Sequence, residues 1–253
     1  IGDITSTNIN SDLSTSAEKW KKVGGVYQDR LRNPNLSDWN VPIIRSRVKS
    51  DGNYEDSIVE RPADQRFYTK RFTNESLNFI DKSVKKEKPF FIFLSHSMVH
   101  VPLFRSPEFK NHSNLGLYGD VLEEIDWSVG QVLRKLRDKG VEDNTYIVFT
   151  SDNGPWLNFG NHAGSTGGLR EGKGTSFEGG QRVPTVMMWG DVIPKGKIAN
   201  QLSSTIDLLP TIASIVDGDL PNHKIDGVNI IEILKGKESE PRDHFYYYYG
   251  NNN

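Results

Sequence analysis

The chain has 253 residues, of which 35% are hydrophobic and 25% charged, a composition typical of a globular protein with a core. Its formal net charge of -2 excludes a general attraction to nucleic acid or to an anionic membrane, so an anionic ligand would need a local basic cluster. The absence of cysteine excludes disulfides, thiolate metal sites and a cysteine-derived nucleophile within these residues. No apolar run approaches the roughly 20 residues of a membrane-spanning helix, and residues 1–10 lack the features of a signal peptide.

The first half of the chain contains two helical patterns and one apolar run. Residues 1–60 are rich in Ser, Asn, Asp, Gly and Pro without a clear period, so we expect an irregular covering segment with at most short elements. Apolar residues at helical spacing predict helices over residues 64–86 and 118–139, the second ending at Gly140. Between them, the continuous apolar run 89–94 predicts a strand that is buried on both faces.

The second half contains two more predicted strands and a third helix. The apolar residues 145–150 predict a buried strand, and a second strand is expected over residues 183–189 after a glycine-rich loop at 156–180. A helix is predicted over residues 207–216, with Asp207 interpreted first as its cap.

This alternation of helices and strands predicts an α/β fold with a mainly parallel sheet and helices on both faces. In such sheets, ligands bind beyond the carboxyl ends of the strands. We expect residues 61–243 to form the core and residues 244–253 to begin a smaller subdomain. The aromatic run Phe245–Tyr249 is interpreted as a half-buried strand, with a carbohydrate-stacking surface as the alternative.

Two polar residues directly follow the predicted strand 145–150. The oxygens of Asp152 and Asn153 are hard ligands suited to Ca²⁺ or Mg²⁺. The same residues, followed by Gly154 and Pro155, are also favoured in a simple turn on backbone grounds. Both interpretations stay open on local sequence alone.

Basic side chains are predicted near the same rim of the sheet. His100, and His96 before it, could hydrogen-bond a substrate oxygen or protonate a leaving group, although a lone histidine at a strand end is more often structural. Lys173 lies among glycines that let the backbone approach an anion, but the phosphate-loop spacing GxxxxGK[ST] is not met, and an exposed lysine is usually just solvated. In combination, these residues predict a site for an anion held by a metal.

Five blocks of sequence, in this order, resemble those of type I sulfatases in the alkaline-phosphatase-like superfamily. They are FFIFLSHSMVHVPLF at 90–104, YGDVLEEIDWSVG at 118–130, IVFTSDNGP at 147–155, LREGKGTSFEGGQRVP at 169–184 and STIDLLPT at 204–211. Ordered blocks with compatible gaps are more specific than any single motif, and the resemblance extends over about residues 41–249.

The resemblance implies roles for five residues of this chain. Asp152 and Asn153 would be ligands of an active-site Ca²⁺, with Mg²⁺ as the less favoured ion. His100 would contact the sulfate and assist the leaving oxygen, and Lys173 would bind a sulfate oxygen. His162 lies where such enzymes often place substrate contacts.

The chain departs from the family pattern at the nucleophile. The family uses a formylglycine made from the Cys or Ser of a C/S-x-P-x-R motif, and neither version occurs in the 253 residues. The adjacent aspartates that complete the family's calcium site are also absent. We therefore expect these parts in a segment that precedes this chain, which alone would be inactive.

The resemblance implies hydrolysis of sulfate monoesters, either of a sulfated carbohydrate or of an aryl sulfate. A phosphomonoester or phosphonate hydrolase of the same superfamily and a non-catalytic remnant that binds sulfated glycan are the alternatives. The expected partner is a sulfated small molecule or glycan, with no nucleic acid and no membrane span, and the sequence does not fix the oligomeric state. The resemblance implies a periplasmic, secreted or lysosomal location.

Overall fold

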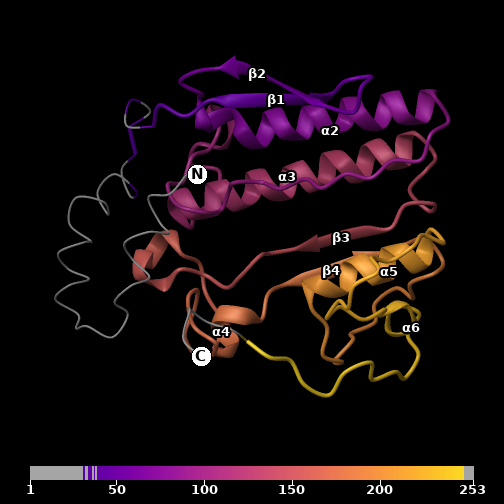
Figure 1. Cartoon of the computed structure of the whole chain (residues 1–253). Coiled ribbons are helices and arrows are strands. Elements are labelled where there is room, and N and C mark those ends of the chain that lie inside the picture. The colour runs from indigo at the N-terminus through magenta and orange to yellow at the C-terminus, as the bar shows by residue number, and fades with distance from the viewer. Residues whose placement is uncertain (1–30, 32–33, 36, 38, 248–253) are drawn as a thin grey trace. The chain divides into compact units, whose positions relative to one another are not determined.

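The computed structural model describes residues 39–247 together with residues 31, 34–35 and 37 (Figure 1). The chain forms two compact units. The first consists of Ile1–Lys139 and Pro155–Gly180, and the second of Gly140–Gly154 and Gln181–Asn253.

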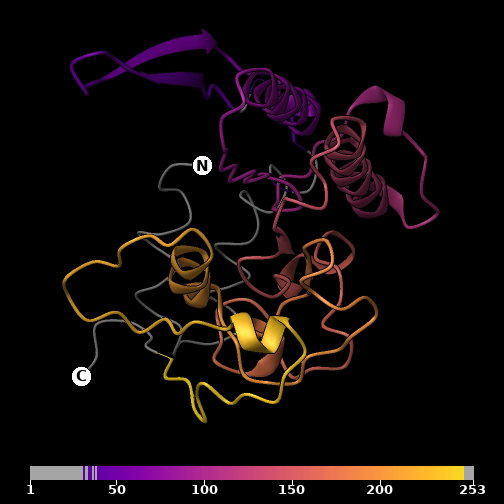
Figure 2. The same ribbon diagram turned by 90° about the vertical axis from the view of Figure 1, so that its right-hand side faces the viewer.

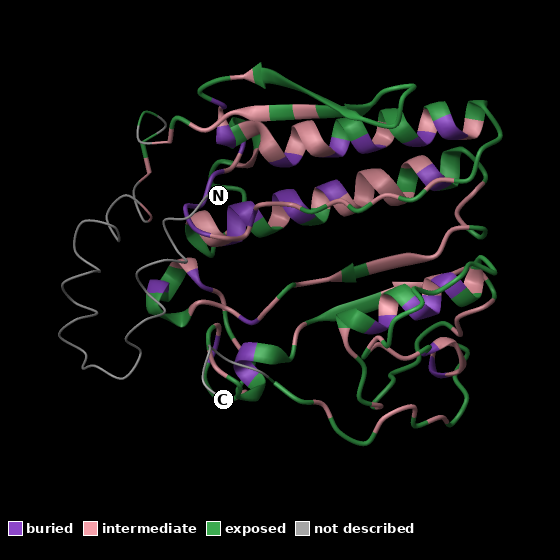
Figure 3. Ribbon diagram, viewed as in Figure 1, coloured by how far each residue is buried: buried purple, intermediate pink, exposed green. Residues whose placement is uncertain are grey.

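Two long helices form the centre of the first unit. Helix α2 (Tyr68–Lys85), which follows the short helix η2 (Gln65–Phe67), and helix α3 (Gly116–Asp138) confirm the two predicted helices and pack side by side (Figures 1 and 2). The buried residues of α2 follow helical spacing along one side (Figure 3): Thr69, Thr73, Ser76, Ile80 and Ser83. Most of them carry hydroxyl groups, so this helix pair depends on satisfied hydrogen bonds as well as on apolar contact.

A β-hairpin lies within the segment for which irregular structure is predicted. Strand β1 (Ile43–Val48) pairs antiparallel with β2 (Tyr54–Glu60), and Val48 lies opposite Tyr54. Most residues of both strands are exposed, so the sequence carries little of the apolar alternation by which strands are predicted.

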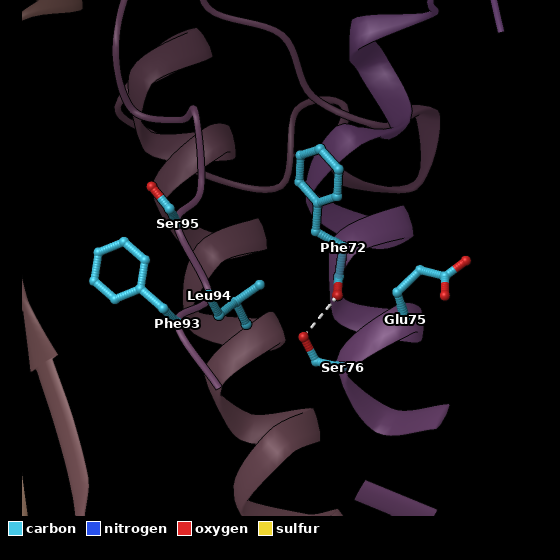
Figure 4. A pocket seen from close by; sticks show the side chains of 6 residues that line it. All are labelled: Phe72, Glu75, Ser76, Phe93, Leu94 and Ser95. Carbon is cyan, nitrogen blue, oxygen red and sulfur yellow. Dashed lines mark hydrogen bonds between the residues drawn. The ribbon is translucent and has the colours of Figure 1, made fainter. Parts of the chain in front are cut away.

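The apolar run 89–94 is not a strand in the described structure, so the prediction of a strand buried on both faces is wrong. Residues 88–97 belong to no helix or strand, and Phe91 and Phe93 are 69% and 80% exposed. An open pocket of about 270 Å³ separates part of this segment from α2, lined by Phe72, Glu75, Ser76, Phe93, Leu94 and Ser95 (Figure 4). An apolar run becomes a strand only where neighbouring strands pair with its backbone, and no described residues do so here.

The chain after this run enters the core of the first unit. Buried members of this core cluster are Met98, Val101, Leu103, Phe104, Val121, Ile125, Phe159 and Ala163. The short helix η4 (Leu157–His162) contributes Phe159 to this cluster, and the short helix η3 (Pro107–Phe109) follows Phe104 along the chain.

Two carboxylates of α3 hold the loop that follows the core cluster. Asp120 accepts a hydrogen bond from the backbone N–H of Asn111 at 3.0 Å. Glu124 accepts one from the backbone N–H of Ser106 at 2.8 Å. Both carboxylates are buried, and they lie one helical turn apart on the same face of α3. The helix therefore fixes the C-terminal end of the segment that carries His100.

The second unit contains an antiparallel strand pair and short helices. Strands β3 (Ile147–Thr150) and β4 (Thr185–Met188) confirm the positions of two predicted strands and run antiparallel, with Ile147 opposite Met188. The burial predicted for residues 145–150 is wrong, because no residue of β3 is buried. The predicted third helix is confirmed as α5 (Leu208–Ile215) after η5 (Thr205–Asp207). The single-turn helices are α4 (Glu178–Gln181), at the point where the chain enters this unit, and α6 (Ile231–Leu234).

Asp207 connects three segments of the second unit and makes no side-chain cap bond to α5, contrary to its first interpretation. Its carboxylate accepts the backbone N–H groups of Ser204 and Val228 at 2.7 and 2.9 Å. It also accepts hydrogen bonds from both terminal nitrogens of Arg242, at 3.0 and 2.5 Å. A fully buried carboxylate is stable only with such partners.

The predicted mainly parallel sheet is not found among the described residues, whose two sheets are both two-stranded and antiparallel. The strand predicted over Phe245–Tyr249 is also absent as far as residue 247, and residues 248–249 lie outside the described part. Among the helices that the structure describes, none is long and apolar enough to cross a membrane.

Candidate functional site

His100 lies in a loop that is anchored in the core of the first unit. Its neighbours Met98 and Val101 are buried, and the backbone N–H of Phe104 donates to Met98 Sδ at 3.3 Å. The backbone N–H of His100 donates to the carbonyl of Ser97 at 3.2 Å. The residues before and after His100 are therefore fixed in place, and its ring is half-buried between them.

Lys173 lies in a loop whose glycines let neighbouring backbone segments pack closely against each other. Its backbone N–H donates to the carbonyl of Pro155 at 2.9 Å. A Cβ atom on Gly172 would lie 2.5 Å from the same carbonyl oxygen, and one on Gly179 would lie 2.0 Å from that of Glu171. Because the backbone is this tightly packed, the main chain fixes the point from which the Lys173 side chain extends.

The structure brings Lys173 and His100 together although they are 73 positions apart in the sequence, with Lys173 Nζ 2.9 Å from His100 Nε2. His100 Nδ1 lies 2.6 Å from the carbonyl oxygen of Val101, which can only accept, so Nδ1 carries a hydrogen. In the neutral ring, Nε2 is then the nitrogen with the lone pair, and it accepts a hydrogen bond from the ammonium group. The geometry describes a neutral His100 beside a charged Lys173.

This pair is suited to an anion. The ammonium group carries three N–H donors, and one of them is directed at His100. Both side chains are half-buried, where a charge acts more strongly on a ligand than it does in bulk water. The interpretation of Lys173 as a merely solvated side chain does not describe this arrangement.

Trp156 lies beside the pair and was missed by the sequence analysis. Its ring centroid lies 5.9 Å from that of His100, and Lys173 Nζ lies 5.3 Å from the same centroid. The available signal was its position, directly after Pro155 at the start of the glycine-rich loop.

His96 takes part in a different set of contacts. Its Nε2 lies 3.0 Å from Ser128 Oγ, which lies 2.6 Å from Thr73 Oγ1 between α2 and α3. Burial lowers the pKa of His96 below its ordinary value of 6.5, because it disfavours the charged ring. These contacts support the structural interpretation of His96 and not a role in substrate binding.

His162 is the last residue of η4, where its side chain is half-buried. It belongs to the same unit as His100 and Lys173. Its contact with substrate stays a prediction.

Asp152 and Asn153 lie in the second unit, separated from the end of β3 only by Ser151. Asp152 is exposed, while the Asn153 amide nitrogen donates to the carbonyl of Gly154 at 2.9 Å and Ser151 Oγ donates to the carbonyl of Asn153 at 3.1 Å. These local bonds are those expected of a turn. They are compatible with a ligand role, because the carboxylate of Asp152 and the amide oxygen of Asn153 do not take part in them.

The donor set of these two residues fits part of a Ca²⁺ site. Calcium takes six to eight oxygen ligands, and carboxylate and carboxamide oxygens are among those it prefers. Within the described residues, no group of three or more His, Cys, Asp or Glu side chains could hold a metal. Asp152 and Asn153 therefore fit such an ion only as members of a larger set of ligands.

Known proteins are similar in sequence to this chain over most of its length. The sulfatase family model matches residues 6–218. N-acetylgalactosamine-6-sulfatase of Canis lupus familiaris is 34% identical over 225 residues, which cover 88% of this chain and 42% of the relative. Steryl-sulfatase of Homo sapiens is 37% identical over 205 residues, covering 79% of this chain and 34% of the relative.

A solved structure gives the same result for the fold. The structure of Ps i-CgsB in complex with k-i-k-neocarrahexaose is 31% identical and matches 74% of this chain and 42% of that chain, with a TM-score of 0.65. The described part of this chain therefore has a sulfatase-like fold, although its strands are few and short. The chain spans 34% to 42% of the length of these three proteins. Because the family model covers most of its residues, this chain belongs to the sulfatase family.

Proposed function

We propose that the protein to which this chain belongs hydrolyses sulfate monoesters, and that His100 and Lys173 bind the sulfate group. The observation that supports this most directly is the 2.9 Å contact between Lys173 Nζ and His100 Nε2. Membership of the sulfatase family supports the reaction class. The contact supports an anion as the ligand, since it places a positive charge and several N–H donors at one point.

Lys173 would neutralise charge on a non-bridging sulfate oxygen. Its ammonium group is held at a fixed distance from His100, so little reorganisation is needed when an anion binds. Such donors contribute most where negative charge increases in the transition state.

His100 would act on the oxygen that leaves. Its Nδ1–H is directed at the carbonyl of Val101, which orients the ring with Nε2 beside Lys173 Nζ. When Nε2 is protonated, it can donate this proton to the departing alcohol oxygen, which leaves the ring neutral.

The proposed reaction needs two further parts, a metal ion and an attacking group. Asp152 and Asn153 would hold a Ca²⁺ together with further ligands, and such an ion would supply positive charge to the reaction. The attacking group would be a formylglycine in a preceding segment, since the C/S-x-P-x-R motif does not occur in the 253 residues. His162 would contact the remainder of the substrate.

The proposed substrate is a sulfated carbohydrate or an aryl sulfate. One relative is named for N-acetylgalactosamine 6-sulfate, and one structural neighbour was solved with k-i-k-neocarrahexaose. These two names support a saccharide ester, whereas the relative steryl-sulfatase is named for a sterol ester. A periplasmic, secreted or lysosomal location, as implied by the family resemblance, is part of the same proposal.

The reaction class is tested by assaying the complete protein on the sulfate and phosphate esters of one phenol. We expect a large preference for the sulfate ester. In the same assay, Lys173→Ala should lower kcat by about 10²-fold or more, because it removes a donor to the developing negative charge. The exposed Lys88 provides the matched control, and Lys88→Ala should leave the rate unchanged.

A preference for the phosphate ester would show that the protein is a phosphate or phosphonate hydrolase instead. A complete protein that binds sulfated glycan without turnover would be the non-catalytic remnant. If Lys173→Ala lowered the melting temperature as much as the rate, Lys173 would be structural.

A further inference from the structure

The C-terminal ends of helices α2 and α3 lie side by side in the first unit. Thr73 of α2 contacts Ser128 of α3, with 2.6 Å between the two hydroxyl oxygens. About two turns further along both helices, Asp81 of α2 binds Lys135 and Lys139 of α3, with Nζ–O distances of 2.8 and 2.7 Å. Because both sets of contacts advance in the same sense, the helices run in the same direction and end together (Figure 1).

This common end of the two helices is strongly basic. We call residues 81–88 and 134–139 the basic end, and together they contain eight Lys or Arg residues and three Asp or Glu residues. Their formal charge is therefore +5, whereas the whole chain has a net charge of -2. An anionic polymer needs a local cluster of this kind to bind a protein of low net charge.

Most of this charge is available to a partner. Five basic side chains are exposed, and within the part of the chain that the structure describes they form no ion pair: Lys82, Lys85, Lys86, Lys88 and Arg134. The helix dipole favours a basic residue only in the last turn of a helix, so it does not account for Lys88, which follows the end of α2. Lys82, Lys85 and Lys86 lie about one turn apart, where like charges repel, and a bound anionic chain would offset that repulsion.

The basic end is separate from the pair His100 and Lys173. Glu124 holds the loop that follows His100, and about 20 Å of helix lies between Glu124 and Arg137 near the end of α3. A sulfated monosaccharide is too short to contact both places, whereas a polymer is long enough. The basic end therefore suits a ligand that is longer than the ester held at the site.

The side chains of the basic end distinguish between anionic polymers. Six of its eight basic residues are lysines, whereas arginine is preferred for the recognition of phosphate and nucleic acid. Residues 81–88 and 134–139 contain no aromatic side chain on which a base could stack. Their apolar residues, Val84 and Leu136, are not exposed and so cannot anchor the helices in a membrane. A polymer whose charge comes without bases or lipid fits these features.

We propose that the basic end binds a chain of sulfated polysaccharide, at a distance from the site where one sulfate ester is held. The choice of a sulfated polymer rests on the proposed function, while the anionic character of the partner follows from the charges alone. Repeated sulfate groups on one chain would meet several ammonium groups at once, so that weak single contacts combine. The basic end would thus retain a polymeric substrate on the protein.

The experiment measures the binding of a fluorescently labelled heparin fragment, a sulfated polysaccharide, to the 253-residue protein by anisotropy. The triple substitution Lys82→Gln, Lys85→Gln and Lys86→Gln should weaken binding about tenfold or more at about 50 mM salt. The dependence of log Kd on log salt should also become shallower, because fewer counterions are released when fewer ammonium groups bind.

A second triple substitution provides the matched control. Lys195→Gln, Lys197→Gln and Lys224→Gln remove the same charge from exposed lysines outside the basic end, and should weaken binding less than about twofold. Equal weakening by both triples, or none by the first, would overturn the proposal. If circular dichroism shows that the first triple does not fold, Lys88→Gln with Arg134→Gln carries the test, and it should weaken binding by about fivefold.

Two competing ligands identify the class of partner. Single-stranded DNA and phosphatidylserine vesicles should bind more weakly than heparin at the same salt concentration. Tighter binding of either ligand, lost in the first triple, would make the basic end a nucleic-acid or membrane surface and would overturn the choice of a polysaccharide.

The double substitution His100→Ala and Lys173→Ala separates this proposal from the proposed function. It should leave the affinity for heparin unchanged, because these residues lie outside the basic end. Loss of heparin binding would place the polymer at the sulfate site and overturn the role of the basic end, with the proposed function intact. Heparin binding that depends on the basic end in a complete protein without sulfatase activity would overturn the proposed function and leave the polymer-binding surface.

Discussion

The hydrogen bond between Lys173 and His100 links the protonation of His100 to the binding of an anion. A charged His100 would place its Nε2–H against the ammonium group at 2.9 Å, so the structure favours the neutral ring while no anion is bound. A sulfate beside both groups would offset their repulsion and accept a hydrogen bond from Nε2–H. We therefore expect sulfate binding near pH 7 to take up protons, up to about one per ligand.

Titration calorimetry of sulfate in two buffers of different ionisation enthalpy measures this uptake. His100→Gln keeps a polar side chain that cannot titrate in this range, so its binding enthalpy should not depend on the buffer. Proton release, or an uptake that persists in His100→Gln, would contradict the assignment of the neutral state to His100.

Glu124 provides a second test at the scale of one residue. Burial raises the pKa of its carboxyl above the ordinary value of 4.5, against a smaller opposing effect of the Ser106 backbone N–H. The folded state therefore holds this proton more tightly than the unfolded state. Its contribution to the free energy of unfolding is complete below about pH 4.5 and is lost as the pH rises through the folded-state pKa.

Glu124→Gln keeps an oxygen for the Ser106 N–H and does not titrate. Its free energy of unfolding should therefore fall less than that of the unsubstituted protein between about pH 5 and pH 8, as measured by urea unfolding. Glu124→Leu removes the acceptor and should cost about 1–3 kcal/mol at both pH values. Parallel pH profiles for Glu124→Gln and the unsubstituted protein would show that the carboxyl does not change its protonation over this range.

At the scale of elements, a chain of hydroxyl groups joins α2 to α3 and to the segment before His100. Thr73 Oγ1 donates to the carbonyl of Thr69 at 2.6 Å, so it can only accept from Ser128 Oγ, also at 2.6 Å. Ser128 then accepts from His96 Nε2 at 3.0 Å, which fixes the tautomer of His96 with its hydrogen on Nε2. Each group in this chain depends on the next for its partner.

Ser128→Ala breaks the chain at its centre. It leaves Thr73 without its donor and His96 Nε2–H without its acceptor, so we expect a loss of about 1–3 kcal/mol in the free energy of unfolding. Ser57→Ala makes the same change in the same unit, at an exposed hydroxyl that donates to the carbonyl of Arg45 at 3.2 Å, and should cost no more than about 0.5 kcal/mol. Similar losses for both variants would show that the buried chain adds nothing to stability.

For the molecule as a whole, the sequence predicted helices and strands that depend on local patterns, and it did not predict how distant strands pair. Helices α2, α3 and α5 were predictable because their apolar spacing and end signals lie within each segment. Strands β3 and β4 were predictable as apolar runs, but their antiparallel direction was not, since it depends on residues nearly 40 positions apart.

The candidate site divides in the same way. No spacing rule relates His100 to Lys173, which are 73 positions apart, and only the family resemblance placed them in one site. Asp152 and Asn153 were correctly expected directly after a strand, whereas Trp156 carried no motif and required the structure. Local patterns thus predicted which elements carry candidate residues, while the contact itself is a property of the fold.

The exposed aromatic residues of the run 89–94 lead to a prediction for the whole protein. Phe91 and Phe93 are 69% and 80% exposed on a segment that pairs with no described strand, and exposed apolar side chains of this size favour association. The relatives are more than twice as long as this chain, so we infer that the longer protein covers this face. The double substitution Phe91→Ser and Phe93→Ser should therefore reduce self-association of the 253-residue chain, as measured by light scattering.

In the longer protein the same substitution should have the opposite effect. Burial of a phenylalanine contributes about 1.5–3 kcal/mol, so the loss of two should lower the free energy of unfolding by about 3 kcal/mol or more. Phe79→Ser, at a 47% exposed position on α2, is the control and should have a small effect in both proteins. If the double substitution were harmless in the longer protein, the run 89–94 would not be buried there, because a core cannot lose two large apolar side chains without a cavity or a buried hydroxyl.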